Sequence, residues 1–80
     1  MTEALFDQLR HGVIEGEPDE ALEATNALLE LEVNPVVILE DGLTRAMMEL
    51  GAMWKRGDAF LPEVVAAAEI FTLCNARIEP

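Results

Sequence analysis

Three prolines divide this chain into four segments, and each proline stands where a helix can begin. Pro18, Pro35 and Pro62 each open a stretch in which apolar residues recur at three- and four-residue steps. A proline is tolerated in the first turn of a helix because its missing N–H would have no partner there. Thr2 can cap a first helix ahead of them. The short connections predict antiparallel neighbours, so the expected fold class is all-α, a small antiparallel four-helix bundle.

The spacing of the apolar residues predicts which side of each helix faces the core. The first helix ends near Gly12 to Gly16, and the fourth runs from Leu61 to about Ile78. The four predicted inner faces, in chain order, are Phe6, Leu9 and Val13; Leu22, Thr25, Leu28 and Leu29; Val36, Leu39, Leu43, Met47, Leu50 and Trp54; and Val64, Val65, Ala68, Phe71 and Ile78. Gly42 interrupts the third stripe, which indicates a close helix crossing there. No alternating pattern predicts a strand.

The composition limits the classes of function. A chain of 80 residues forms one domain at most. A hydrophobic fraction of 51% with a net charge of -11 fits a folded helical bundle. Because an acidic surface repels phosphate backbones, a nucleic acid is not an expected partner. No apolar run is long enough to span a membrane and no secretion signal is recognisable, so we expect a cytoplasmic protein with no membrane partner.

Catalytic and metal-binding patterns are weak. The only cysteine, Cys74, has no disulfide partner and is predicted to be a small core residue. The only histidine, His11, has no nucleophile placed near it by the sequence. Five carboxylates gather near the second helix start, without a calcium-loop pattern, and are predicted to form a solvated face: Glu15, Glu17, Asp19, Glu20 and Glu23. The chain by itself is therefore not expected to be an enzyme, and no residue is predicted to bind a metal.

The stretch from Met53 to Val65 breaks a local rule. If Pro62 is the first residue of the fourth helix, Leu61 occupies the N-cap, where a polar side chain normally accepts a backbone hydrogen bond. The only tryptophan, Trp54, ends the preceding stripe, so a short loop brings it to the same end of the bundle as Leu61. By periodicity Trp54 is a structural anchor in the core. The alternative is an apolar platform at this end of the bundle, beside the helical face along which Leu61, Val64 and Ala68 recur at three- and four-residue steps.

A resemblance favours the platform. The order Gly51-x-x-Trp54-x-x-Gly57-x-x-Phe60-Leu61-Pro62-Glu63-Val64-Val65, followed by an alanine-rich helix, resembles the helical cap domain of methyl-carrying corrinoid proteins. This family includes the cobalamin region of methionine synthase and the corrinoid proteins of methyltransferase systems. In it the bundle covers the upper face of the corrin and shields the cobalt-bound methyl group. The resemblance implies that Trp54, Leu61 and Val64 are the cofactor-binding residues and that the cofactor is methylcobalamin.

The resemblance also implies what lies elsewhere. Family members follow the cap with an α/β domain whose Asp-x-His-x-x-Gly motif supplies the lower cobalt ligand, and this chain has no such motif. Residues 1–80 are therefore expected to be the cap part of a longer protein, with that cobalamin-binding domain and methyltransferase subunits as partners. In related light-sensing regulators, a Glu-His pair occupies the positions of Val64 and Val65. These apolar residues suit a methyl group better.

A second hypothesis is a helical interaction module that self-associates or docks a partner protein through its apolar end, without a cofactor. A homodimer of this chain is compatible with either hypothesis.

Overall fold

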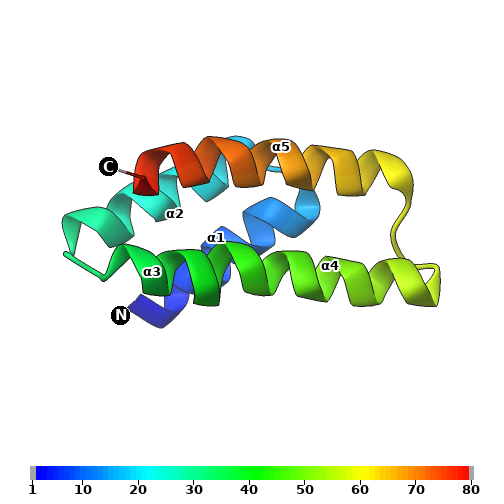
Figure 1. Cartoon of the computed structure of the whole chain (residues 1–80), viewed down its shortest axis with the longest axis horizontal. Coiled ribbons are helices and arrows are strands. Elements are labelled where there is room, and N and C mark those ends of the chain that lie inside the picture. The colour runs from blue at the N-terminus through cyan, green and yellow to red at the C-terminus, as the bar shows by residue number, and fades with distance from the viewer. Residues whose placement is uncertain (1, 80) are drawn as a thin grey trace.

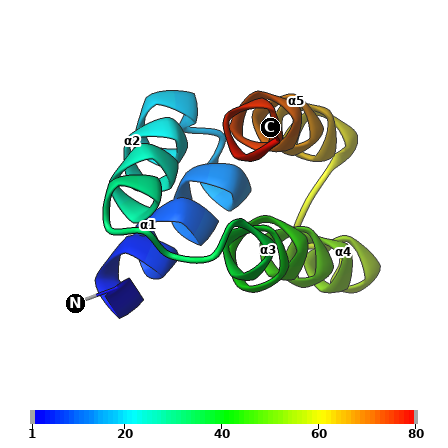
Figure 2. The same cartoon turned by 60° about the vertical axis from the view of Figure 1, so that its left-hand side comes forward.

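The computed structural model describes residues 2–79, which form four helical rods packed side by side (Figure 1). In chain order the rods are α1 (Thr2–Glu15), α2 (Pro18–Glu30), a continuous rod made of α3 (Pro35–Val37), the π-helix η1 (Ile38–Thr44) and α4 (Arg45–Arg56), and finally α5 (Leu61–Ile78). Figure 2 shows the α1–α2 pair beside the pair formed by the third rod and α5. The predicted all-α four-helix fold is confirmed. Within residues 2–79, no helix combines the length and apolarity needed to cross a bilayer.

The third rod contains the element that the sequence did not predict. In η1 the backbone N–H of Arg45 donates to the carbonyl of Glu40, five residues earlier, so this turn is wider than an α-helical turn. Gly42 lies in η1 against α1, and a Cβ there would come within 2.5 Å of Leu9 Cδ2. The predicted helix crossing at Gly42 is thus confirmed.

The wide turn corrects the predicted inner face of this rod. Val36 was expected to face the core, but its exposed fraction is 57%, and Ile38 is fully buried instead. An α-helix would place Val36 in phase with Leu43 and Leu50. Because each turn of η1 holds more residues than an α-helical turn, the residues before η1 are rotated relative to those after it. This rotation turns Ile38 toward the core and Val36 toward solvent.

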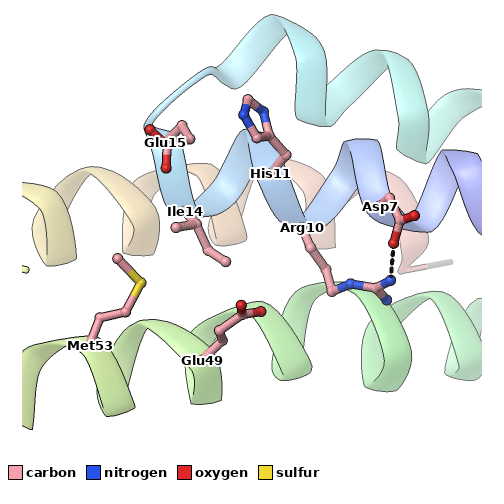
Figure 3. Close-up of a pocket in the computed structure, with 7 residues that line it drawn as sticks. All are labelled: Asp7, Arg10, His11, Ile14, Glu15, Glu49 and Met53. Carbon is pink, nitrogen blue, oxygen red and sulfur yellow. Dashed lines mark hydrogen bonds and ion pairs between the residues drawn. The ribbon is translucent and has the colours of Figure 1, made fainter. Parts of the chain in front are cut away.

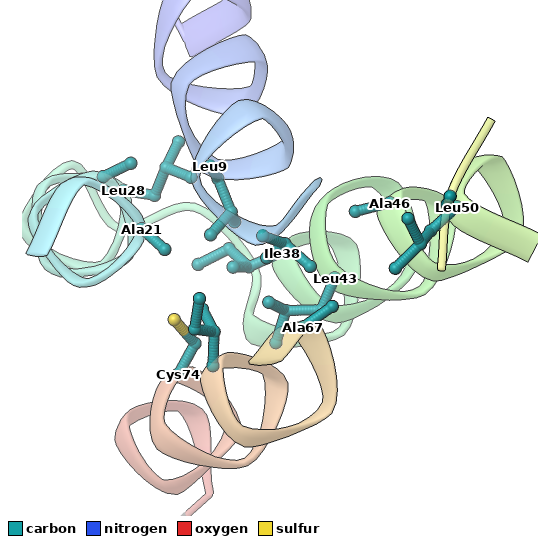
Figure 4. Close-up of a cluster of buried hydrophobic side chains, with 13 residues drawn as sticks. Leu9, Ala21, Leu28, Ile38, Leu43, Ala46, Leu50, Ala67 and Cys74 are labelled. Carbon is teal, nitrogen blue, oxygen red and sulfur yellow. The ribbon is translucent and has the colours of Figure 1, made fainter. Parts of the chain in front are cut away.

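The core lies where the four rods meet (Figure 4). Its largest buried aliphatic side chains are Leu9, Val13, Leu28, Ile38, Leu43 and Leu50. Cys74 is also fully buried, as predicted. Thr25, the buried polar residue of this core, donates its hydroxyl to the carbonyl of Ala21 at 2.9 Å, so burial leaves no unmet hydrogen bond.

The predicted inner face of α5 is partly wrong. Ala67, Ile70 and Cys74 are buried, whereas Val65 is 48% exposed and Ala68 is exposed. Val64, Phe71 and Ile78 are partly buried against the core, as expected. Five consecutive apolar residues, Val64 to Ala68, cover more than one full turn of α5, so periodicity defines its inner face poorly.

Helix α5 spans Leu61–Ile78 as predicted, but its N-cap differs from the prediction. The N-cap is Phe60, so α5 begins at Leu61 and Pro62 is its second residue. The backbone N–H of Phe60 donates to Oε1 of Glu63 at 3.0 Å, which satisfies that backbone donor from inside the helix. The hypothesis of a leucine at an uncapped helix end is therefore wrong. Leu61 is the first residue of α5, so a missing cap does not explain why its side chain is exposed.

Candidate functional site

An apolar groove opens between α4, along Met47 to Trp54, and the first turn of α5. Its volume is about 300 Å³, and its lining is almost entirely apolar. The lining residues are Met47, Leu50, Gly51 and Trp54 from α4 and Leu61 and Val64 from α5. The three residues that the sequence singled out therefore lie together in one groove. Hereafter it is called the Trp54 groove.

The loop between the two helices brings these residues together. Helix α4 ends at Gly57, whose φ of 80° lies in the left-handed region, and the N–H of Asp58 donates to the Met53 carbonyl at 2.8 Å. Ala59 is buried and fixes the loop to the bundle. Arg56 and Asp58 form an exposed ion pair at 3.0 Å. This tight connection reverses the chain, so that the end of α4 and the start of α5 run antiparallel (Figure 1).

The bundle leaves Trp54 and Leu61, at the rim of the groove, largely uncovered. The exposed fraction is 49% for Trp54 and 62% for Leu61, whereas Leu50 at the base of the groove is 1% exposed. The interpretation of Trp54 as a core anchor is therefore wrong. Large apolar side chains that cluster on a surface mark a binding site more often than isolated ones do.

The sequence reasoning missed half of the groove. Met47 and Leu50 were correctly assigned to the core stripe, on the same side of α4 as Trp54, but their additional role in lining the groove was not predicted. Gly51 was noted only as part of the motif. The signal that could have placed them was their spacing from Trp54, once Trp54 was assigned to the surface.

The groove can cover a ligand but is poorly suited to react with it. Its lining residues carry no ionisable side chain and no hydroxyl. Within the described part of the chain, no group of three or more His, Cys, Asp or Glu side chains is placed to hold a metal ion. Such a surface excludes water from whatever lies against it, and the chemistry must come from the bound group.

A second cavity, of about 360 Å³, lies between α1 and α4 (Figure 3). Arg10 at its edge is already engaged, since Nη2 contacts Asp7 Oδ1 at 2.6 Å and Nη1 donates to the Asp41 carbonyl at 2.6 Å. His11 pairs with Glu20 at 3.1 Å. These contacts hold α1 to η1 and α2. The cavity shows no nucleophile next to a base, so it does not resemble a catalytic site.

Comparison with known proteins identifies the family. The model of the B12 binding domain matches residues 5–78. The chain is 30% identical to a corrinoid protein of Desulfitobacterium hafniense, over 100% of this chain and 37% of that protein. It is 34% identical to trimethylamine corrinoid protein 1 of Methanosarcina mazei, over 96% of this chain and 34% of that protein.

A third relative, dimethylamine corrinoid protein 3 of Methanosarcina acetivorans, is 36% identical over 88% of this chain and 32% of that protein. The chain thus spans about a third of the length of these curated relatives. No solved structure matches it. Because the family model covers nearly the entire chain and the relatives align along it, this chain belongs to the B12 binding domain family and corresponds to the N-terminal helical cap of corrinoid proteins.

Proposed function

We propose that this helical cap covers the upper face of methylcobalamin through the Trp54 groove. The observation that carries the proposal is that Trp54, Leu61 and Val64 line one apolar groove while Trp54 is 49% exposed and Leu61 is 62% exposed. The family match supports it, because the matched relatives are named as corrinoid proteins. An exposed indole and a leucine at the same rim offer a flat apolar contact for a planar macrocycle.

The residues fit the upper side of such a cofactor and not the side that ligates the metal. The groove offers carbon and sulfur surface with almost no polar atoms, which suits an alkyl group and the ring around it. Methylcobalamin supplies a methyl group bound to cobalt for transfer. Trp54, Leu61 and Val64 contribute by excluding water and competing reactants from that group. The lower ligand and most of the cofactor's binding surface are assigned to an α/β domain outside this chain.

In this proposal, the contact of Trp54 and Leu61 with the cofactor also controls access to the methyl group. Fully burying a leucine- or valine-sized side chain contributes about 1.5–3 kcal/mol. Because Trp54 and Leu61 are already partly covered in the cap, closure over the cofactor gains only part of that amount for each residue. A contact of a few kcal/mol keeps the cap mostly closed, yet a partner methyltransferase that binds the open state can displace it. The cap therefore controls access to the methyl group, and its motion does not perform the chemistry.

Nuclear magnetic resonance titration with methylcobalamin tests the contact in the corrinoid protein of Desulfitobacterium hafniense, with this chain exchanged for its matched segment so that the rest of the cofactor site is present. The expected result is a saturable change in the Trp54 indole and Val64 methyl signals, with the outer face of α2 unaffected. Adenosylcobalamin is the matched control ligand, because its bulky upper group blocks the same face and should abolish the change. If methylcobalamin leaves the groove signals unmoved, or if both cobalamins move them equally, the proposal fails.

The second candidate is a helical interaction module that docks a protein through the same end of the bundle. Its supporting observation is that Phe60, in the loop next to the groove, is 65% exposed. In that case the chain self-associates through this end, and the Trp54 signals change with protein concentration but not with methylcobalamin. Sedimentation of the native chain and of a Trp54→Ala variant over a range of concentrations separates the two functions.

A further inference from the structure

The five glycines of the chain separate into four that the fold requires and one that it does not. A Cβ on Gly12 would lie 2.8 Å from the backbone nitrogen of Ala21, and a Cβ on Gly42 would collide with Leu9. Gly16 and Gly57 have φ values of 72° and 80°, which side-chain-bearing residues rarely adopt. Gly51 has neither a close neighbour nor a positive φ, because it lies inside α4 and a Cβ there would meet no atom within 4 Å.

Gly51 is therefore unfavourable within the isolated chain. A glycine in the interior of a helix is less stable than alanine, because it loses more conformational freedom on folding and has no side chain to pack. The fold would accept alanine at this position without moving any neighbour. Such a local conflict without an internal compensation indicates a requirement from outside the chain.

The position of Gly51 points to that requirement. Gly51 lines the Trp54 groove, three residues before Trp54 and four residues after Met47, so all three lie on one side of α4. A helical side chain leans over the turn that precedes it, which directs the Trp54 indole toward the turn containing Gly51. The missing Cβ therefore leaves bare backbone next to the indole on the open side of the groove.

We infer that Gly51 is a contact residue for the cofactor, at which the edge of the corrin macrocycle lies directly against the backbone of α4. This inference rests on the proposed function. Only glycine lets a ligand approach a helix so closely, since any Cβ would hold the macrocycle away from Leu50 at the base of the groove. The groove lining has almost no polar atoms, so the contacting part of the ligand is a neutral ring edge and not a charged group.

The test substitutes Gly51→Ala, with Ala52→Gly as the matched control, in the 80-residue chain for thermal melting and in the exchanged Desulfitobacterium hafniense corrinoid protein for methylcobalamin binding. Ala52 is the next residue of α4, is exposed, and does not line the groove. Gly51→Ala should raise the melting temperature by about 2–8 °C. It should weaken the binding of methylcobalamin, measured from the Trp54 and Val64 signals, by about tenfold. Ala52→Gly should lower the melting temperature and leave the binding of methylcobalamin unchanged.

The outcomes separate this inference from the proposed function. If the native chain binds methylcobalamin and Gly51→Ala binds it equally well, the inference about Gly51 is wrong and the proposed function stands. If the exchanged protein carrying the native chain binds methylcobalamin without any change in the groove signals, both are overturned. A more stable Gly51→Ala chain that binds more weakly supports the inference, because a residue needed only for folding could not give both changes.

Discussion

The exposure of Trp54 and Leu61 depends on where these residues lie in the bundle more than on how apolar their side chains are. Trp54 continues the stripe of Leu50, yet Leu50 is buried and Trp54 is half exposed. The difference arises because Trp54 lies in the last turn of α4, beyond the part of the helix that the bundle covers. Leu61 is exposed for the corresponding reason at the first position of α5. The exposure of both residues thus comes from where their helices end.

The buried thiol of Cys74 makes the stability of the chain depend on pH. Burial raises the pKa of the Cys74 thiol above its ordinary value of 9.0, and the hydrogen bond with Thr25 only partly opposes the rise. As the pH rises past that ordinary value, the unfolded thiol loses its proton first, so the unfolded state binds fewer protons and the free energy of unfolding falls. Urea unfolding between about pH 8 and pH 10 should show this fall. A Cys74→Ala variant should show a shallower dependence, and equal slopes would contradict the account.

At the scale of elements, η1 behaves as one additional residue inserted in an α-helix. It keeps Ile38 and Leu43 on the core side at once, and the Asp41 carbonyl in this wide turn accepts a hydrogen bond from Arg10. Deleting the exposed residue Glu40 should let η1 become α-helical with both core residues still in phase. The expected variant keeps its helical circular dichroism and unfolds cooperatively.

Deletion of Met48 is the matched control, because Met48 is 71% exposed and lies in regular α-helix. That deletion rotates the two parts of the rod by about 100° relative to each other. Displacing even one large core side chain costs about 2–5 kcal/mol, which is close to the total stability of a small domain. The Met48 deletion should therefore unfold the chain. Equal damage from both deletions would show that η1 is not an inserted residue.

The elements also show how far the sequence could predict the structure. The starts of α2 and α3 were predictable, because Pro18 and Pro35 mark them locally. The outward rotation of Val36 was not, since Val36 and Ile38 are both apolar and only the hydrogen-bond pattern of η1 decides between them. Trp54, Leu61 and Val64 were selected through resemblance to a family motif. Their shared groove depends on the relative placement of α4 and α5, which no periodicity specifies.

Residues 2–79 form an acidic, elongated bundle, with the apolar Trp54 groove at the end where α4 meets α5. Its principal extents are 37, 21 and 18 Å and its net charge is -11. Like charges on such a surface disfavour random association between copies. An uncharged groove on an acidic protein therefore directs binding to one place, and the proposed occupant is the upper face of the cofactor.

The rate at which light cleaves the cobalt–methyl bond tests this cover most directly. The chain is placed in the corrinoid protein of Desulfitobacterium hafniense in exchange for its matched segment, and the protein is loaded with methylcobalamin. The native cap should slow photolysis several-fold relative to a Trp54→Ala, Leu61→Ala double variant, and Met48→Ala, away from the groove, should behave as the native cap. Equal photolysis rates for the native cap and the double variant, at equal cofactor content, would contradict the proposal that the Trp54 groove covers the methyl group.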